Sequence, residues 1–434
     1  MKKFLYSVFM LAAVVLAACS NDDNGDTQPK RGMTLNASVE NLSSRATMTD
    51  ESGTWKFAFA VNDQVSVSNN KISNYYTFTN NGSQFTCAQA EVTKEDADWY
   101  AYFPGNDVDL TNQTGTFADV ANYFAVAGGT AEATTGEKGL SITLKPKVAV
   151  LRIVAVDKKG ILDIHVKTAD GKWVKGLTAT KNAAEFTVST SDAKTTLLQK
   201  AEGTVNAGEI NYVVVPADVK IEIYNGDMLL NKTKDAGLTA GKYYTITSGP
   251  TKGTETALIK GVEKKINWVQ LWAGGPRFAT ENVAEDMTWT EAAKTGSDYV
   301  WGANWRTPTA EEVEVEGGLL FDWSTGQAQA GSPTFTITTA ADGTEETVVF
   351  TGVQPGYTKN TLTLYKKVVN GYNQFDFWTS TNDGGYGCKF IIWRKDNITW
   401  GFGISKRHDP NTEYHLVRPV LSIQNITNIT NNKK

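Results

Sequence analysis

The stretch LSITLKPKVAVLRIVAV, residues 140–156, decides the fold class of this sequence. It holds two strong predicted strands, at 141–144 and 148–156, in which valine, isoleucine, leucine and threonine predominate. Residues of these types favour extended backbone, and the stretch has no helical period of apolar residues. We therefore expect β-structure at this point of the chain.

Short strand-like runs continue on both sides of this stretch. On the N-terminal side they lie at 33–39, 65–68, 75–78 and 99–103, and on the C-terminal side at 164–166, 210–215, 221–224 and 243–247. Glycine, asparagine and aspartate separate the runs, and no long helical period interrupts them. Alternation with a period of two, broken by turn residues, predicts all-β sandwiches from about residue 33 to about residue 249.

The composition changes near residues 249–253, and nine of the twelve tryptophans lie beyond this point. Two short helices are predicted there, one at about 290–294 and one that starts at Thr309. The second is marked by Thr309 and Glu312, which have the spacing of a capping box after Pro308. Short strands and long loops make up the rest, so we expect a separate α+β domain.

The first residues have the features of a bacterial export signal. Lys2 and Lys3 precede an apolar run at 4–18, which is too short for a lasting membrane span. The run ends in LAAC at 16–19, the pattern of a lipobox, so Cys19 is the predicted lipid-bearing residue and 1–18 the cleaved signal. The polar, acidic stretch that follows, at 19–32, is predicted to be a linker and resembles a surface-export signal of Bacteroides-group lipoproteins.

Composition excludes several functional classes. The net charge is −5, and the only basic run is Lys433–Lys434, which argues against a nucleic-acid partner. Besides Cys19, the cysteines are Cys87 and Cys388, which fall in different predicted domains, so no disulfide framework is expected. The three histidines show no zinc-site spacing, and no phosphate loop, nucleophile elbow or catalytic cysteine context occurs. We therefore expect no metal, no cofactor and no enzyme activity.

Residues 33–249 resemble the fimbrillin (Mfa-like) family of Bacteroides-group pilus lipoproteins. The resemblance rests on the lipobox and on SRAT at 44–47, YFP at 102–104, YVVVP at 212–216 and LTAGKYY at 238–244, in that order. It implies two tandem transthyretin-like β-sandwiches.

Residues 264–423 resemble the major paralogous domain first named from Fibrobacter. The matching motifs are WVQLW at 268–272, GPRFAT at 275–280, NV at 282–283, WGANWRTPT at 301–309, FWTST at 377–381 and LVRPV at 416–420. The resemblance implies a C-type-lectin-like fold. The calcium signature of lectins and the paired cysteines of formylglycine-generating enzymes are both missing from this sequence. The resemblance therefore implies a fold and does not imply catalysis.

Together these observations predict a mainly β chain with six segments. They are a signal peptide (1–18), a lipidated linker (19–32), an N-terminal β-sandwich (33–139), a second β-sandwich (140–249), a lectin-like domain (250–424) and a tail (425–434).

The fimbrillin resemblance also implies processing. In that family an Arg-specific protease removes the first strand, and a strand from another subunit fills the emptied groove. In this sequence the removed strand would present Met33, Leu35, Ala37 and Val39 inward. Arg45 would be the cleavage site and Ala46 the new N-terminus, although a plain loop arginine is the alternative reading.

The predicted function is that of a pilus tip subunit at the outer membrane and cell surface. Strand exchange would join it to other pilins, and the lipid at Cys19 would hold the precursor to the membrane. Because the predicted C-terminal strand belongs to the lectin-like domain, the chain would accept a strand without donating one.

Several readings stay open for the C-terminal domain. Trp301 and Trp305 are expected to pack in a core, and Arg306 and Arg418 to satisfy buried oxygens. Trp393 and Trp400, near the loop-rich part, either pack or stack on a glycan of a host or bacterial surface. The alternatives are a non-polymerising surface lipoprotein that binds glycans, and an enzyme that uses carboxylates such as Asp322 and Asp376.

Overall fold

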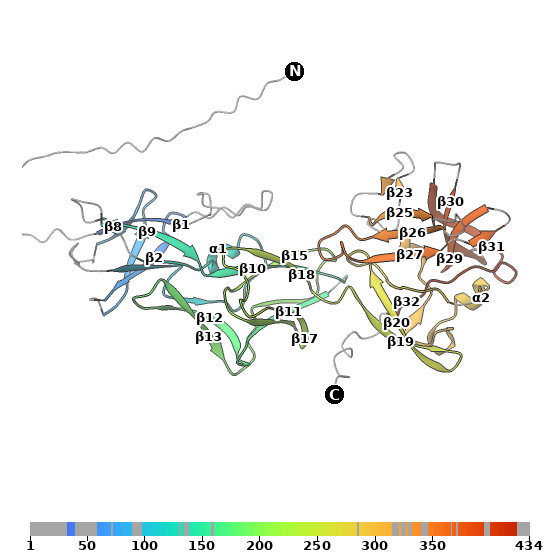
Figure 1. The fold of residues 1–434 in the computed structure, drawn as a ribbon, viewed down its shortest axis with the longest axis horizontal. Helices are drawn as coiled ribbons and strands as arrows, with labels where there is room; N and C mark the ends of the chain where they lie inside the picture. Colours follow the sequence, from blue (N-terminus) through green and yellow to red (C-terminus); the bar gives the residue numbers. More distant parts are fainter. Residues whose placement is uncertain are drawn as a thin grey trace, which may run out of the picture.

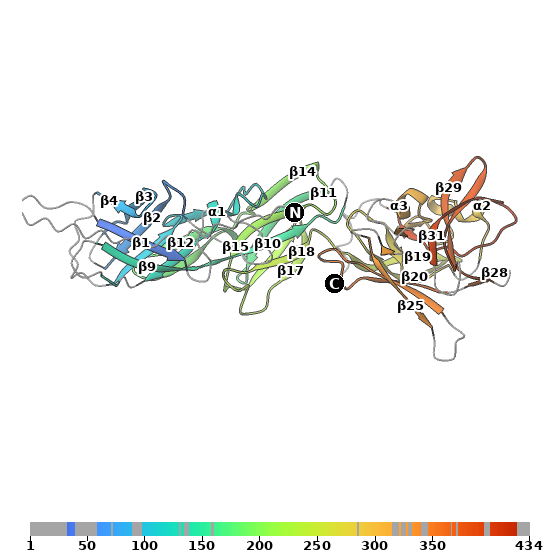
Figure 2. The ribbon, with the colours of Figure 1, turned by 90° about the horizontal axis from the view of Figure 1, so that it is seen from above.

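Figures 1 and 2 show an elongated molecule in which β-sheets follow one another along the long axis. This computed structural model describes residues 33–39, 59–70, 73–88, 98–129, 132–133, 139–157, 160–283, 286–314, 321–322, 327–328, 332–339, 346–365, 367–369, 372–394 and 400–422. The mainly β prediction is confirmed, because the few helices among these residues are no longer than five residues. No described helix is long and apolar enough to cross a membrane.

The first sheet closes on itself through its first strand. Its members are β1 (Met33–Val39), β2 (Gln64–Asn69), β3 (Tyr76–Asn80), β4 (Phe85–Cys87), β5 (Trp99–Phe103), β7 (Val126–Gly129), β8 (Glu132–Ala133) and β9 (Gly139–Pro146). Their order is β1-β4-β3-β2-β5-β7-β9-β8, and β1 also pairs with β9. Strand β1 thus completes a ring of seven strands, to which β8 is attached.

The second unit consists of two facing sheets. A three-stranded sheet has the order β15-β10-β18, and a larger sheet has the order β13-β12-β11-β16-β17, with β14 and β6 attached to it. The strands are β6 (Asp107–Asp109), β10 (Val148–Val154), β11 (Gly160–Thr168), β12 (Trp173–Thr180), β13 (Glu185–Ser191), β14 (Leu198–Val205), β15 (Ile210–Pro216), β16 (Ile221–Asn225), β17 (Met228–Lys232) and β18 (Tyr243–Thr247).

The first two units share one hydrophobic core, which extends from Met33 to Leu238. Strand β6 pairs with β12 of the second unit, and the short helix α1 (Val120–Tyr123) contacts β15. Conversely β9, which was expected to open the second sandwich at residue 140, pairs with β1 and β7 of the first sheet. The sheets therefore do not divide at the predicted boundary of 139/140, because these pairings cross it in both directions.

The described part of the C-terminal unit contains four sheets of short strands and three short helical segments. One sheet has the order β19-β20-β21-β32-β22, a second β25-β26-β27 and a third β28-β29-β30-β31, and β23 pairs with β24. The strands are β19 (Lys252–Ile259), β20 (Val262–Gln270), β21 (Arg277–Ala279), β22 (Trp305–Arg306), β23 (Phe321–Asp322), β24 (Gln327–Ala328), β25 (Thr334–Thr339), β26 (Glu346–Thr351), β27 (Thr361–Tyr365), β28 (Lys367–Val369), β29 (Tyr372–Asp383), β30 (Tyr386–Arg394), β31 (Trp400–His408) and β32 (Val420–Leu421). The helices are α2 (Trp289–Ala292), the 3-10 turn η1 (Gly296–Asp298) and α3 (Ala310–Glu314).

The predicted capping box at the second helix is confirmed. The backbone N–H of Glu312 donates to Thr309 Oγ1 at 3.1 Å, and Thr309 N–H donates to Glu312 Oε2 at 2.8 Å. Both bonds satisfy donors that the first turn of a helix leaves without partners. Arg306 donates to both carboxylate oxygens of Glu312, which fixes α3 beside β22.

The tryptophan and arginine predictions for the core are also confirmed. Trp301 and Trp305 are buried, with ring centroids 5.5 Å apart in an edge-to-face arrangement. Arg418 is fully buried and donates to the carbonyls of Ala279 and Thr363. Burial lowers the pKa of Arg418 to about 10, and its guanidinium links β21 to β27.

A junction of buried polar contacts joins the second unit to the C-terminal unit. Arg277 is 5% exposed and donates to Asp157 Oδ1 at 2.9 Å and Oδ2 at 3.2 Å. The amide of Gln270 and the backbone N–H of Gly274 both donate to the carbonyl of Val156. The fully buried Tyr357 packs against Val156 as well, so apolar and polar contacts hold the two units together.

Candidate functional site

The groove that holds β1 is the candidate site for strand exchange. On one side β1 runs antiparallel to β4, with Met33–Leu35 paired to Cys87–Phe85. On the other side it runs parallel to β9, where Thr34–Val39 pair with Gly139–Leu144. Figure 1 shows β1 and β9 side by side at the end of the molecule opposite the C-terminal unit.

The side chains of β1 alternate as the sequence predicts for an inward face. Met33 and Leu35 are 4% and 0% exposed, and Ala37 and Val39 are half-buried against the same core. Burial of one such aliphatic side chain contributes about 1.5–3 kcal/mol. Met33 and Leu35 together therefore contribute roughly 3–6 kcal/mol to the seating of β1.

The groove itself is lined by apolar residues from both neighbours. Phe85 and Cys87 on β4 are buried, and so are Leu140, Ile142 and Leu144 on β9, while the residues between them on β9 face outward. Without β1, the inner residues would lose their apolar cover, and the backbone groups of β4 and β9 that now face β1 would lose their partners. Unpaired backbone and an apolar slot are the two features that an added strand satisfies.

The two halves of β1 are held differently. Met33 pairs with β4, and Thr34 and Leu35 pair with both β4 and β9, whereas Asn36–Val39 pair with β9 alone among the described strands. The second half is also less deeply buried than the first. The C-terminal end of β1, which precedes Arg45 in the sequence, is therefore its more weakly held end.

Several predicted site residues lie outside the described residues. Cys19, Arg45 and Ala46 belong to this group, and their lipidation and processing stay predictions. Trp393 lies on β30 opposite Gly401, and Trp400 lies on β31 opposite Arg394, but their side chains are also outside the described part. Their contact with a glycan stays a prediction.

The C-terminal unit brings together two histidines that sequence spacing did not connect. His408 ends β31, His415 follows seven residues later, and their ring centroids are 6.0 Å apart. Asp376 on β29 contacts His415 Nδ1 at 2.9 Å, and Lys389 on β30 contacts His415 Nε2 at 3.1 Å. The sequence contains the pattern His-x4-Glu-x-His at 408–415, but only the fold shows that these three side chains meet.

The pKa values of His408 and Asp376 are both shifted by their neighbours in this cluster. Burial lowers the pKa of His408, and the nearby Lys389 and His415 lower it further, against the opposing effect of Glu413. Burial would raise the pKa of Asp376, but His415 and Lys389 outweigh it and hold that pKa below the ordinary value. Near neutral pH, His408 is therefore expected to be neutral and Asp376 to be ionised.

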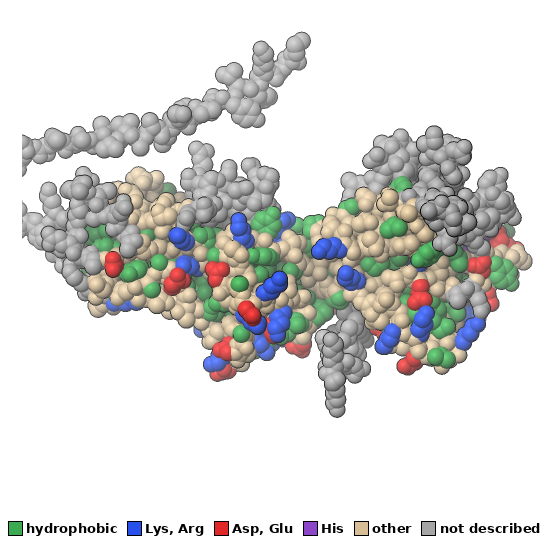
Figure 3. Space-filling view, viewed as in Figure 1, with side chains coloured by type: hydrophobic (Ala, Val, Ile, Leu, Met, Phe, Trp, Pro, Cys, Tyr) green, Lys and Arg blue, Asp and Glu red, His purple; other side chains and the backbone are tan. Residues whose placement is uncertain are grey.

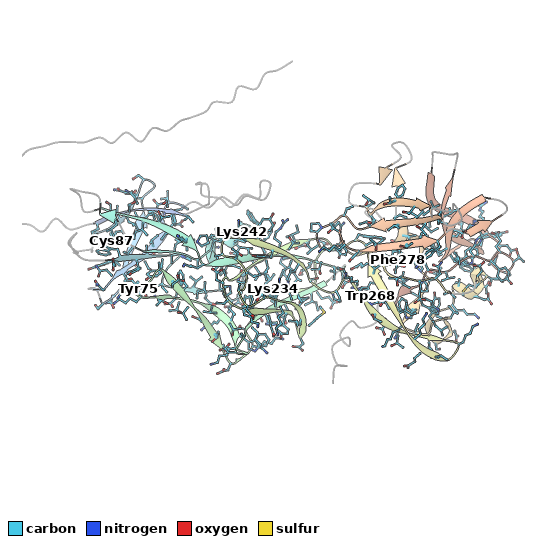
Figure 4. The ribbon with its side chains drawn as sticks, viewed as in Figure 1. Tyr75, Cys87, Lys234, Lys242, Trp268 and Phe278 are labelled. Atoms are coloured by element: carbon cyan, nitrogen blue, oxygen red, sulfur yellow. The ribbon has the colours of Figure 1, made fainter. Side chains whose placement is uncertain are left out.

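The two cysteines within the described residues lie in different units of the molecule. Cys87 and Cys388 are both buried, in the first and the C-terminal unit respectively, and neither forms a disulfide within the described residues. Figure 4 labels Cys87 at the end of the molecule near β9, far from Trp268 and Phe278 of the C-terminal unit. On the face drawn in Figure 3, basic and acidic side chains are interspersed along the molecule.

No protein-family model matches the chain. No curated protein sequence matches it either. Among solved structures, a fimbrial protein from Bacteroides ovatus is 11% identical, with 91% of this chain and 99% of that chain covered, at a TM-score of 0.24.

Two further solved structures are similar to about half of the chain. A candidate cell adhesion protein from Bacteroides uniformis is 12% identical and covers 55% of this chain and 98% of its own, at a TM-score of 0.31. Another from Bacteroides ovatus is 10% identical, covers 55% and 96%, and has a TM-score of 0.30.

Proposed function

We propose that the chain is a surface pilus subunit that accepts a strand from another subunit in place of β1. The observation that carries the proposal is the closure of the first sheet by β1. This strand lies before Arg45, pairs on both sides and fills a slot lined by Phe85, Leu140 and Ile142. Cleavage after Arg45 would leave β1 attached by pairing alone, and another strand could then take its place.

The proposal includes the route to the surface. A lipid at Cys19 would carry the precursor to the outer membrane, and the lipid would leave with the first strand after cleavage. The mature subunit would begin at Ala46 and would be held by a partner's strand. Its role is binding and assembly, and we propose no catalytic activity.

A position at the pilus tip is the finer part of the proposal. Strand β32 pairs with β21 on one side and with β22 on the other, so it is already part of a sheet of the C-terminal unit and is not available for donation to another subunit. The ion pair of Arg277 with Asp157 and the contacts of Gln270 and Tyr357 mount this unit firmly on the second one. A firmly mounted domain at one end of an elongated molecule is suited to presenting a binding surface.

The processing step is tested with wild-type protein and the Arg45→Ala variant expressed in a Bacteroides host. We expect the assembled wild-type protein to begin at Ala46 by N-terminal sequencing, and Arg45→Ala to keep its lipid and to be missing from pili. Arg152→Lys, which keeps the charge at a distant site, is the matched control. An intact lipidated Cys19 in assembled wild-type material would refute the processing.

The location is tested by immunogold labelling of purified pili. Label at the ends supports the tip role, and label along the shaft refutes it. Label confined to cell bodies favours the second candidate, a non-polymerising lipoprotein that binds glycans through the face near Trp393 and Trp400. Glycan-array binding by the full chain would then identify its ligand.

A further inference from the structure

A short loop in the C-terminal unit brings two histidines and a glutamate to one point. The histidine loop comprises residues 408–415, with His408 at the end of β31 and His415 at the other base of the loop. Asp409 Oδ1 accepts from the backbone N–H groups of Asn411 and Thr412, and Asp409 N–H donates to Glu413 Oε1. The loop is therefore folded by its own hydrogen bonds, which fix the direction of Glu413.

The three side chains present their ligand atoms to one another. His408 Nδ1 lies 2.7 Å from Glu413 Oε2, and His415 Nε2 lies 3.4 Å from the same oxygen. One ligand atom from each residue lies within 4.8 Å of the others. Ligand atoms of a tetrahedral Zn²⁺ site with bonds of about 2.0–2.2 Å are about 3.3–3.6 Å apart, so small side-chain movements suffice.

In each histidine, the ring nitrogen that does not contact Glu413 also has a partner. His415 Nδ1 contacts Asp376 Oδ2 at 2.9 Å, and the side chain of Asp376 is fully buried. His408 Nε2 lies 2.8 Å from Ser405 Oγ. Outer groups of this kind set the tautomer of a metal-binding histidine, and a carboxylate partner also raises its basicity. The pair of Asp376 with His415 therefore makes Nε2 the nitrogen that carries the lone pair, and this atom lies 3.4 Å from Glu413 Oε2.

Lys389 is the competing cation at this point. Its ammonium lies 3.1 Å from His415 Nε2 and 3.3 Å from Asp376 Oδ2. If a metal took the lone pair of Nε2, Lys389 would keep Asp376 as its partner, so its charge would stay compensated. The glutamate side chain is 41% exposed, which leaves the outer side of the cluster open to solvent.

We propose that His408, Glu413 and His415 form a binding site for one divalent transition-metal ion. Two imidazoles and one carboxylate, with an open fourth position, are the donor set of many Zn²⁺ sites. A bound ion would link the two bases of the histidine loop and leave one coordination position facing outward. The site lies in the C-terminal unit, at the opposite end of the molecule from β1 (Figure 1).

The test uses the full chain without a histidine tag, because the sequence then has only three histidines. Titration with Co²⁺, followed by its visible absorption, and competition with Zn²⁺ measure stoichiometry and affinity. We expect one ion per chain, an intense absorption typical of low coordination number, and displacement by Zn²⁺. The variants are His408→Gln and Glu413→Gln, and Glu263→Gln on the exposed part of β20 is the matched control.

Each variant at the site is expected to weaken binding at least tenfold, and Glu263→Gln to leave it unchanged. Circular dichroism without metal checks that each variant is folded, and Glu413→Gln carries the test if His408→Gln is not. Absence of a 1:1 complex in the wild type overturns the proposal. Binding that survives both site variants overturns it too, because the ion then sits elsewhere.

Discussion

Replacement of Leu35 by alanine should loosen β1 and leave the rest of the chain folded. Leu35 is fully buried, and its neighbours in the ladders are Phe85 on β4 and Leu140 on β9. Truncation of a buried leucine to alanine costs about 2–5 kcal/mol, part of it from the cavity that is left behind. If β1 opens as a local unit, this cost lowers the free energy of its opening by the same amount.

The magnitude follows from the equilibrium between closed and open β1. A factor of ten corresponds to about 1.4 kcal/mol, so 2–5 kcal/mol raises the open fraction by roughly 30-fold to 4,000-fold. Cys87 reports this opening because it is the ladder partner of Met33 and is only 6% exposed. We therefore expect its thiol to react with a maleimide only when β1 has left its place.

The assay is pulsed maleimide labelling of the full chain, followed by mass spectrometry of the peptides. Cys388, fully buried in the C-terminal unit, is the internal control for global unfolding. Leu229→Ala is the matched variant, because Leu229 is 47% exposed on β17 of the second unit. We expect Leu35→Ala to accelerate the labelling of Cys87 and to leave Cys388 unchanged.

Two results would refute this reasoning. If Cys87 and Cys388 react at the same rate in Leu35→Ala, the substitution unfolds the whole chain and β1 does not open by itself. If Cys87 reacts no faster than in the wild type, β1 is not what protects the thiol.

Three further predictions concern the C-terminal unit and its junction. Asp157→Ala leaves the buried guanidinium of Arg277 without its carboxylate, so we expect a loss of about 1–3 kcal/mol, and calorimetry should show two transitions where we expect the wild type to show one. Although burial raises the pKa of Glu312, the pair with Arg306 outweighs it and holds that pKa below its usual 4.5, so the stabilisation by this pair is present above pH 4.5 and lost as the pH falls through the lowered pKa. Denaturant titrations between mildly and strongly acidic pH should therefore show a smaller loss of stability for Glu312→Gln than for the wild type. An equally steep loss in the variant would contradict this. Arg418→Lys cannot reach both carbonyls that the fork of Arg418 satisfies, so urea unfolding should show a loss of about 1–3 kcal/mol, and an unchanged midpoint would rule this role out.

The sequence predicts the local elements of this fold well, for a physical reason. Alternation at 33–39 and the run at 148–156 reflect burial of one face or of both, and they correspond to β1 and β10. The capping box of Thr309 and Glu312 depends on neighbours three residues apart, so it too is visible in the sequence. In each case the determining contacts lie within the segment or follow from its own pattern.

Long-range pairing could not be predicted in this way. Strand β1 pairs with β9, about a hundred residues later, and β6 crosses to β12 in the next unit. Alternation tells which face is buried but contains no information on which strand lies alongside. The meeting of His408 with His415 has the same origin, because it depends on a loop held by Asp409 and on Asp376 from another strand.

The junction of Arg277, Asp157 and Gln270 affects the cost of ligand binding by the C-terminal unit, because it restricts the orientation of this unit. A domain on a flexible linker samples many directions and loses that freedom when it binds, at a cost in affinity. Here the second and C-terminal units share buried contacts, so the orientation is fixed before any encounter. The orientation of the outermost surface would then be set by the long axis of the molecule. Several such molecules on one cell could bind a target at the same time only if the spacing and orientation of its binding sites match theirs.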